Sequence, residues 1–426
     1  MGGKVKRVLH NKYRIMLAII LMLGFIIRVS VIFFHGVQLT INSDDMGYVS
    51  SALAFLDHHI ISYHSPDEPT LHIMPGITFL LAMIFKVFGY SPDGTGMYVA
   101  KMVMIFFGLG TIYVTYLIGK YVYHPLAGII ASFLVAVHIP QVLTNNLLLT
   151  ENPFIFLSML LIYYSLKLAN THSMKDFILL VVVFFFALYF RVQIAIYPFI
   201  LFIYLVLKKY PYKRMWKQLM VSIALLFIFL GPWWIRNYLA FDEFVFLTKG
   251  AGNPLLLGTY QGIGYPESPT IDEIDQMARE KNPNLQVHEL MEFERQAAID
   301  RLKEWWATDP KSMIRSYVEL KPKHFWQDEF YWIPILGISE QLVNKIYSYI
   351  KILFYFSFLS SLLFVFHRWK EYVLLGGWVV LQTFFNCLYF SYNRYALALM
   401  PIIFLFIGIG SAAWMIKLKQ KWLSRT

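Results

Sequence analysis

The sequence predicts an all-α protein that crosses a membrane many times, and three observations support this fold class. First, 58% of the residues are hydrophobic and 15% are charged, whereas a soluble domain has roughly 45–50% apolar and about 25% charged residues. Second, the mean hydropathy is positive, at +0.54. Third, the apolar residues come in blocks close to the about 17–25 residues that a transmembrane helix needs.

Ten apolar blocks are candidates for membrane spans. The first follows a polar, basic segment of residues 1–14. It is too long for the core of a signal peptide and has no small-residue cleavage site, so we expect it to be retained. The fifth and sixth blocks are short for two spans. The predicted spans are 15–34, 97–118, 126–148, 153–168, 177–190, 193–207, 219–235, 346–366, 372–390 and 396–416.

The segment 75–89 is too short for an eleventh span. Its apolar run covers residues 77–88, contains Lys86 and follows Pro75-Gly76. A run of about 10–14 apolar residues suits an interfacial or re-entrant helix better. Residues 46–56 carry apolar side chains at helical spacing and predict another interfacial helix in the same loop. The acidic pair just before it would lie near the N-cap, where a carboxylate is stabilised.

The positions of Lys and Arg predict the orientation. If segment 75–89 does not cross, basic residues gather on one side of the membrane, whereas the loop 36–74 on the other side contains no Lys or Arg. The basic side is cytoplasmic by the positive-inside rule. Both termini are therefore expected in the cytoplasm, and the loop 36–74 on the outer face. This placement accounts for the net charge of +11, so nucleic acid is not an expected partner.

The chain divides into three predicted parts. Residues 1–236 form an N-terminal membrane module whose first outer loop covers 36–96. Residues 237–345 form an outer, mostly helical segment, with helices expected at 287–308 and 312–323. Residues 346–426 hold the C-terminal transmembrane helices. The single cysteine, Cys387, lies in an apolar block, so neither a disulfide within the chain nor a thiolate metal site is expected.

In this topology, the unusual polar residues share the outer side. Carboxylates there suit a hydroxyl group or a metal ion, whereas guanidinium groups bind phosphate oxygens bidentately. A phosphate-bearing lipid in the outer leaflet is the natural ligand for such a site. The residues are Asp44, Asp45, His72, Lys101, Glu151, Asn152, Arg191, Arg236, Asn237 and Arg394.

Each of these residues also has a purely structural interpretation. Asp44 or Glu151 could cap the helix that follows it. Arg191 could extend to the membrane interface, and Arg236, after Pro-Trp-Trp, could be an interfacial anchor. His72 lies in a loop with several other histidines and could simply be solvated. Only the convergence of these residues on one face favours a functional site.

The chain carries a series of short motifs in order: Ser43-Asp44-Asp45-Met46-Gly47-Tyr48, Met74-Pro75-Gly76, Thr150-Glu151-Asn152, Pro232-Trp233-Trp234-Ile235-Arg236-Asn237 and Arg394-Tyr395. Over nearly its whole length, the chain resembles the polyprenyl-phosphate-dependent GT-C glycosyltransferases, in the branch of protein O-mannosyltransferases and lipid A aminoarabinose transferases. Two positions depart from the family pattern. Asp44-Asp45 replaces the usual Asp followed by Glu, and Met74 replaces a proline of the Pro-Pro-Gly form.

The resemblance implies a GT-C fold, a lipid-linked phosphosugar as donor, and an acidic residue of the first outer loop as base or metal ligand. We hypothesise that Asp44 is the base, and that Asp45 and Glu151 shape the site or hold a divalent cation, Mg²⁺ or Mn²⁺. Arg191, Arg236 and Arg394 would bind the phosphate. The other expected substrate-binding residues are Tyr48, His72, Lys101, Asn237 and Tyr395.

The expected activity is transfer of a hexose or pentose from a polyprenyl-phosphate donor to a hydroxyl group, at the outer face of the cell membrane. The acceptor could be a cell-envelope glycan, a lipid or a protein. Two alternatives remain. A transporter or flippase would use the carboxylates as a proton or cation site, although transporters place charges near the bilayer midplane and show repeated halves. A ligase or polymerase would transfer whole lipid-linked glycans.

Overall fold

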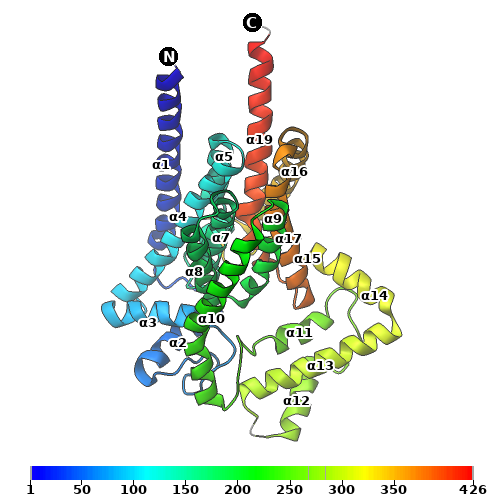
Figure 1. Cartoon of the computed structure of the whole chain (residues 1–426). Coiled ribbons are helices and arrows are strands. Elements are labelled where there is room, and N and C mark those ends of the chain that lie inside the picture. The colour runs from blue at the N-terminus through cyan, green and yellow to red at the C-terminus, as the bar shows by residue number, and fades with distance from the viewer. Residues whose placement is uncertain (1, 267, 284, 425–426) are drawn as a thin grey trace.

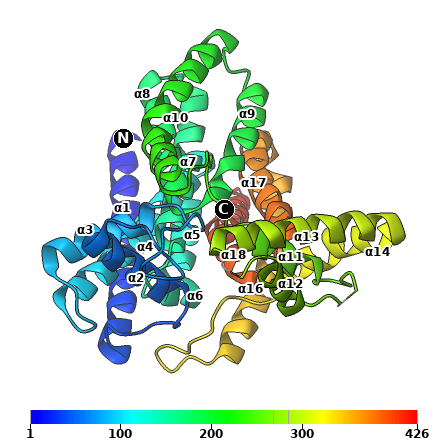
Figure 2. The same ribbon diagram turned by 90° about the horizontal axis from the view of Figure 1, so that it is seen from below.

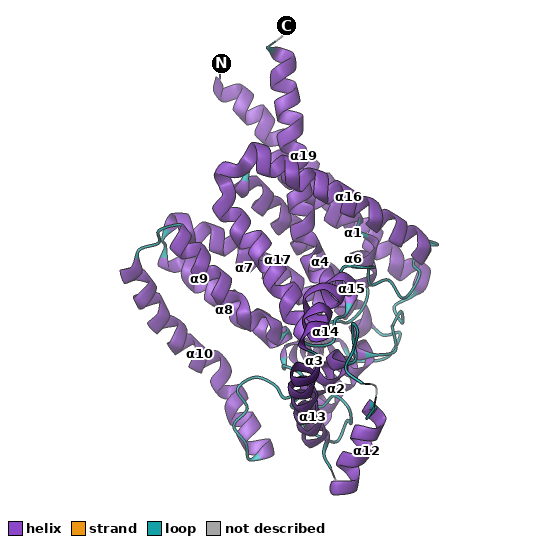
Figure 3. Cartoon of the chain, turned by 90° about the vertical axis from the view of Figure 1, so that its right-hand side faces the viewer, coloured by secondary structure: helices purple, strands orange, loops and turns teal. Residues whose placement is uncertain are grey.

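The computed structural model describes residues 2–266, 268–283 and 285–424, and within them the chain is helical without strands (Figure 3). The long helices α1 (Gly2–His35) and α19 (Met400–Leu423) run roughly side by side, so that both chain ends lie at one end of the molecule (Figure 1). At the opposite end lie α2 (Asp44–His58), α3 (Gly76–Phe88) and the helices α11 to α13.

Within the described residues, six segments are long and apolar enough to cross a membrane: 11–35, 95–122, 151–171, 212–241, 340–388 and 393–422. They contain α1, α4 (Thr95–Val122), α7 (Glu151–Thr171), α10 (Tyr212–Phe241), α16 (Glu340–Val365), α17 (Trp369–Leu388) and α19. Shorter apolar helices are α3, α5 (Pro125–Val137) and the stretch 192–207 that contains α9 (Tyr197–Leu207). The predicted membrane-protein class is confirmed, and each predicted span lies mainly on helix, including 177–190 on α8 (Met174–Phe190). The number of crossings and the orientation stay predictions.

The predicted span 126–148 differs, because its helix breaks. α5 ends at Val137, and α6 (Ile139–Thr144) starts anew after an extended His138. Pro140 has no N–H to donate to the carbonyl of Ala136, four residues earlier. The Nη1 of Arg28, a buried residue of α1, donates to that carbonyl instead, at 2.9 Å. The break therefore leaves a carbonyl free to accept from the buried guanidinium group of Arg28.

Helix α19 is the axis of the bundle, and Figure 2 shows its end near the centre of the view along the bundle. Of its most apolar stretch, 89% is buried. It packs against α5 and α16, and glycines allow close approach. A Cβ added at Gly410 would lie 1.9 Å from the carbonyl oxygen of Ser357, and one at Gly408 would lie 2.4 Å from that of Ala127. Side chains at these positions would force the helices apart.

The first outer loop contains two packed helices. Residues 46–56 fall within α2 and 75–89 surround α3, so the helical character of both predicted segments is confirmed. The hydroxyl groups of Ser51 and Thr78 hydrogen bond across the buried contact at 2.8 Å. The location of these helices at the membrane interface stays a prediction.

The outer segment contains α11 (Gly252–Thr259), α12 (Ile271–Lys281), α13 (Val287–Thr308), α14 (Pro310–Arg315) and α15 (Lys321–Phe325). The predicted helix 287–308 is confirmed as α13. The predicted helix 312–323 instead contains a wide π-helical turn at 316–320, between α14 and α15. Pro322 cannot donate to the carbonyl of Val318, which favours a wider turn there. The three-part domain division stays a prediction, and its positions 1, 267, 284 and 425–426 lie outside the described residues.

Candidate active site

The two adjacent carboxylates at the start of α2 have different surroundings. Asp45 is buried and faces the preceding loop. Its Oδ2 accepts hydrogen bonds from the Thr40 hydroxyl at 2.6 Å and the Ile41 N–H at 2.9 Å. Its Oδ1 accepts from the N–H groups of Ser43 at 3.2 Å and Met46 at 3.0 Å. Asp45 therefore fixes the turn into α2, a role that needs a carboxylate acceptor at a helix start.

Asp44 points the other way and enters a cluster of charged side chains. Its Oδ2 lies 2.7 Å from Nη1 of Arg394 in α18 (Asn393–Ala396), the short helix that leads into α19. The same guanidinium holds Glu151 at the start of α7, with Nη2 donating to Oε2 at 3.1 Å. Nη1 of Arg191, just after α8, lies 2.7 Å from Oε1 of Glu151. Four segments far apart in the sequence thus meet through alternating acids and bases.

The cluster contains two carboxylates and two guanidinium groups, so its formal charge is zero. The exposure of its members differs. The Asp44 side chain is 33% exposed and that of Glu151 is 2% exposed. Glu151 is therefore the buried counter-ion of both arginines, whereas Asp44 stays partly open to solvent.

Two amide side chains hold the chain next to Glu151. Asn152 donates from Nδ2 to the carbonyls of Thr144 at 2.8 Å and Leu147 at 3.0 Å. Asn145 donates to Oδ1 of Asn152 at 2.6 Å and accepts from Nε of Arg28 at 2.7 Å. The start of α7 is thus tied to the broken span and to α1.

Aromatic rings surround the guanidinium groups. Arg191 lies over the ring of Tyr395, at 4.9 Å from its centroid, and Arg394 lies over that of Phe330, at 5.5 Å. Such cation–π contacts favour the charged form where water is scarce. Beside them, the rings of Trp332 and Tyr392 lie 5.4 Å apart. Tyr395 was expected at the site; Phe330, Trp332 and Tyr392 were not.

Two tyrosines complete the surroundings of Asp44. The hydroxyl of Tyr63 donates to Oδ1 of Asp44 at 2.9 Å, and the ring of Tyr48 lies 5.6 Å from that of Tyr63. Burial is the main cause that raises the pKa of both phenols well above the usual value, and the nearby Asp44 charge adds to it. Both therefore stay protonated at neutral pH, and Tyr63 remains a donor to the carboxylate.

His72 lies one layer further out. Its ring stacks on that of Tyr63 at 4.9 Å and 17°, and its Nδ1 lies 3.4 Å from Sδ of Met291 in α13. Burial, with a smaller effect of His64, lowers the pKa of His72 to about 4. His72 is therefore neutral at physiological pH and links the outer segment to Tyr63 rather than contacting Asp44.

Three of the expected substrate-binding residues do not join the cluster. Arg236 donates from Nη1 to the carbonyl of Thr70 at 2.9 Å and from Nη2 to that of Ile61 at 3.1 Å. Its neighbour Asn237 donates to the carbonyl of Val245 at 3.3 Å. Lys101 donates from Nζ to the carbonyl of Leu39 at 2.6 Å. These side chains hold the outer loops through main-chain carbonyls.

The carboxylates present do not fit a divalent cation. Both oxygens of Asp45 accept N–H or hydroxyl groups, and both oxygens of Glu151 face guanidinium groups. A bound cation would need several free oxygen ligands and would lie beside two positive charges. Within 2–266, 268–283 and 285–424, no group of three or more His, Cys, Asp or Glu side chains is placed to hold a metal.

The loop that carries Arg394 is held by contacts that the sequence did not predict. Gln261, between α11 and α12, accepts from the Ser391 N–H at 2.5 Å and donates to the Ser391 carbonyl at 3.1 Å. The Ser391 hydroxyl donates to the Lys321 carbonyl at 2.8 Å. A glutamine in a loop has no pattern that marks it for such a role, whereas Tyr63 could have been suspected from its place in the same loop as Asp44.

Comparisons with known proteins agree with this architecture. A family model described as dolichyl-phosphate-mannose-protein mannosyltransferase matches residues 67–235, and a search of the curated proteins finds no match. The chain is similar to the apo oligosaccharyltransferase of Archaeoglobus fulgidus, with a TM-score of 0.57 and 13% identity over 96% of this chain and 52% of that one.

Two further solved structures are similar. AglB from Archaeoglobus fulgidus, in complex with an inhibitory peptide and a dolichol-phosphate, has a TM-score of 0.54 and 15% identity over 96% of this chain and 51% of that one. ArnT from Cupriavidus metallidurans, bound to undecaprenyl phosphate, has a TM-score of 0.44 and 12% identity over 94% of this chain and 78% of that one. The chain spans about half the length of the archaeal enzyme. The likeness to that enzyme confirms the predicted GT-C fold.

Proposed function

We propose that this chain is a membrane glycosyltransferase that moves a hexose from a polyprenyl-phosphate carrier to a hydroxyl-bearing acceptor. The single observation that carries the proposal is the cluster of Asp44, Arg394, Glu151 and Arg191, in which one partly exposed carboxylate is held beside the buried Arg394 guanidinium and the partly buried Arg191. The match to a mannosyltransferase family model and the dolichol-phosphate bound by a protein of the same fold support the donor class.

In the proposed reaction, Asp44 takes the proton of an acceptor hydroxyl as its oxygen attacks the anomeric carbon of the donor. The bond between that carbon and the phosphate oxygen breaks, and the electron pair leaves with the polyprenyl phosphate. Tyr63 and Arg394 hold the Asp44 carboxylate in place from two sides. Asp45 does not take part directly, because it fixes the turn that aims Asp44.

Arg191 is the proposed phosphate-binding residue. Within the described part of the chain, its contacts with Glu151 and Thr150 both use Nη1. No hydrogen bond of Nε or Nη2 is seen among the described residues, so these donors suit the oxygens of the departing phosphate. Placing a fixed positive charge where negative charge develops is usually the largest contribution to such catalysis. Arg236, expected in the same role, is assigned to holding the first outer loop.

The test is sugar transfer in proteoliposomes. Purified protein is supplied with polyprenyl-phosphate-linked hexose carrying a radiolabel and with candidate acceptors, and Asp44→Asn is compared with wild type. The control is Asp67→Asn, an exposed carboxylate of the same loop. Transfer by Asp44→Asn equal to wild type would exclude Asp44 as the base.

The same assay separates the alternatives. Product size distinguishes transfer of one sugar from transfer of a whole glycan. A flippase would move a fluorescent polyprenyl-phosphate lipid between leaflets without forming product.

A further inference from the structure

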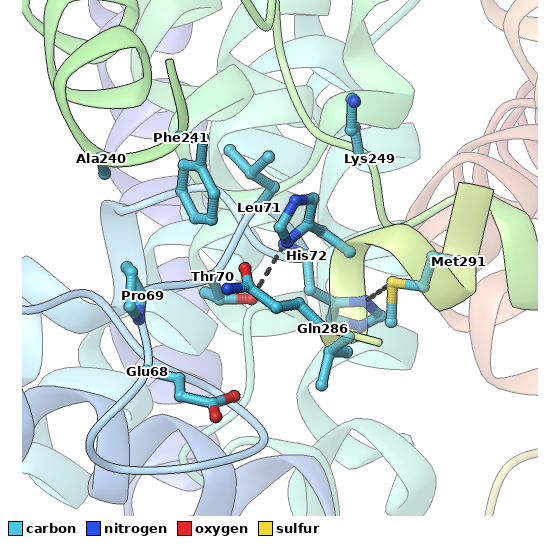
Figure 4. Close-up of a pocket in the computed structure, with 12 residues that line it drawn as sticks. Glu68, Pro69, Thr70, Leu71, His72, Ala240, Phe241, Lys249, Gln286 and Met291 are labelled. Atoms are coloured by element: carbon cyan, nitrogen blue, oxygen red, sulfur yellow. Dashed lines mark hydrogen bonds between the residues drawn. The ribbon is translucent and has the colours of Figure 1, made fainter. Parts of the chain in front are cut away.

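A cavity of about 130 Å³ lies between the first outer loop and the outer segment. Figure 4 shows its walls: Glu68 and His72 from the loop, Phe241 from the end of α10, and Gln286 at the start of α13. An apolar cavity of about 150 Å³ is known to hold one benzene ring. The space therefore suits a single six-membered ring.

The lining offers the contacts of a sugar-binding site. The rings of Phe241 and His288 lie 5.0 Å apart at 74° and provide an apolar wall. The amide of Gln286 and the carboxylate of Glu68 provide donors and acceptors, and Glu68 forms no ion pair among the described residues. A carboxylate can accept from two neighbouring hydroxyl groups at once.

The charge of the cavity favours a neutral ligand. Its lysine, Lys249, is already paired with Glu243. Burial lowers the pKa of both His72 and His288, so that both rings are neutral at physiological pH. A phosphate would therefore meet the uncompensated carboxylate of Glu68 without a free cation to offset it.

The main chain of the cavity is not free to bind a peptide. The Thr70 carbonyl accepts from Arg236, and the Thr70 N–H donates to the Ile61 carbonyl at 2.8 Å. The Leu71 carbonyl accepts from the Lys249 N–H, also at 2.8 Å. Extended peptides are usually bound through such main-chain groups, and these three groups are already used.

The cavity is next to the candidate base. His72 forms part of its wall and stacks on Tyr63, whose hydroxyl donates to Asp44 at 2.9 Å. The stacked rings of His72 and Tyr63 thus lie between the cavity and Asp44. The cavity and the candidate base are therefore connected through the His72–Tyr63 stack.

We propose that this cavity is an acceptor subsite that binds one neutral pyranose ring, so that the acceptor is a glycan. The proposal rests on the proposed glycosyltransferase function. In it, Phe241 packs against the face of the ring, while Glu68 and Gln286 bind its hydroxyl groups.

A binding test that needs no donor and no turnover separates the two proposals. The only cysteine, Cys387, is buried, so Val287→Cys places a new thiol in the cavity wall while keeping the Gln286 cap. The control is Val318→Cys, the same substitution at an exposed site of the outer segment. Both are labelled with a maleimide in the presence of methyl α-mannopyranoside, methyl α-glucopyranoside, a serine-containing peptide or inorganic phosphate.

We expect a methyl glycoside to slow the labelling of Val287→Cys at least threefold and to leave Val318→Cys unchanged. Protection by the peptide or by phosphate alone, or by none of the four compounds, would overturn the subsite. Glycoside protection without sugar transfer in proteoliposomes would instead keep the subsite and reject the enzymatic function.

A kinetic test then connects the cavity to transfer. We expect Glu68→Gln to raise the KM for a glycan acceptor about tenfold without changing kcat, because Glu68 is exposed and outside the charged cluster. Glu280→Gln, on the exposed side of α12, is the control. An unchanged KM, or a loss confined to kcat, would contradict a binding role.

Discussion

Arg394 lies 350 positions after Asp44 in the chain, yet its Nη1 lies 2.7 Å from the Asp44 carboxylate. The same guanidinium also binds Glu151, so one side chain joins the first outer loop, the start of α7 and the approach to the last helix. This contact distinguishes the two adjacent aspartates, because Asp45 bonds to the preceding loop instead.

Replacing Asp44 by Asn should lower kcat for transfer by about 10²–10⁴-fold, the usual contribution of a general base. Binding of the lipid-linked donor should change little, because Arg191 and Glu151 keep their contact. Steady-state kinetics with labelled donor measure the first effect and donor-binding titration the second.

Replacing Glu151 by Gln should destabilise the fold, because two buried guanidinium groups lose their shared counter-ion. Removing one partner of a buried ion pair costs about 3–5 kcal/mol. Thermal unfolding in detergent measures the change. Glu319→Gln is the control, since its pair with Arg315 is exposed and contributes at most about 1 kcal/mol. Equal melting of both variants would contradict the role given to Glu151.

Replacing Gln261 by Ala should lower kcat about tenfold while leaving the donor KM near that of wild type. Gln261 holds both main-chain groups of Ser391, three residues before Arg394, and small displacements of a catalytic constellation are costly. Gln261→Glu keeps the acceptor for the Ser391 N–H and should recover part of the rate. Gln276→Ala, at an exposed side chain of α12, should behave as wild type.

Lys321 should make stability depend on pH. Burial lowers its pKa to about 7, whereas an unfolded lysine titrates near 10.4. Between these values the unfolded chain holds one more proton, so this residue makes stability rise with pH, by at most about 1.4 kcal/mol per pH unit. Lys321→Met should remove that contribution. Melting curves of both proteins from pH 6 to 10 test this, and parallel pH profiles would refute it.

Transfer should persist after treatment with EDTA, because the carboxylates near the cluster are already bonded to cationic side chains and N–H groups. The measurement is the initial rate before and after chelation, with Mg²⁺ and Mn²⁺ added back. A rate that falls with EDTA and returns with either ion would show that the cluster rearranges to bind a metal.

The sequence predicted where the helices lie along the chain, but not which way individual side chains point. Apolar blocks located the helices, because burial in a bilayer demands them. They missed the break at Pro140, which depends on Arg28 reaching a carbonyl from another helix. Asp44 and Asp45 are the same residue type and cannot be distinguished by sequence, but successive residues of a helix point about 100° apart. Only one of them can therefore face Arg394.

The contacts of the three arginines could not be predicted from the sequence either. Arg191, Arg236 and Arg394 each follow or precede an apolar block, which places them at helix ends on one face. Whether their guanidinium groups meet depends on packing between helices distant in sequence. Two of them share Glu151, and the third binds the carbonyls of Thr70 and Ile61. The residues next to each arginine in the sequence do not show whether its guanidinium group binds a carboxylate or a main-chain carbonyl.

The close approach of α19 to α16 at Gly410 has a consequence for the candidate active site. Arg394 lies just before the first turn of α19, whose apolar stretch is almost wholly enclosed. A helix that is packed on all sides cannot bend locally, so a displacement at one end moves the whole helix. A methyl group added at Gly410 would therefore displace the guanidinium group of Arg394, which lies beyond the other end of the helix. Loss of activity from such a substitution would then come from the displaced position of Arg394, and not from the removal of a reacting group.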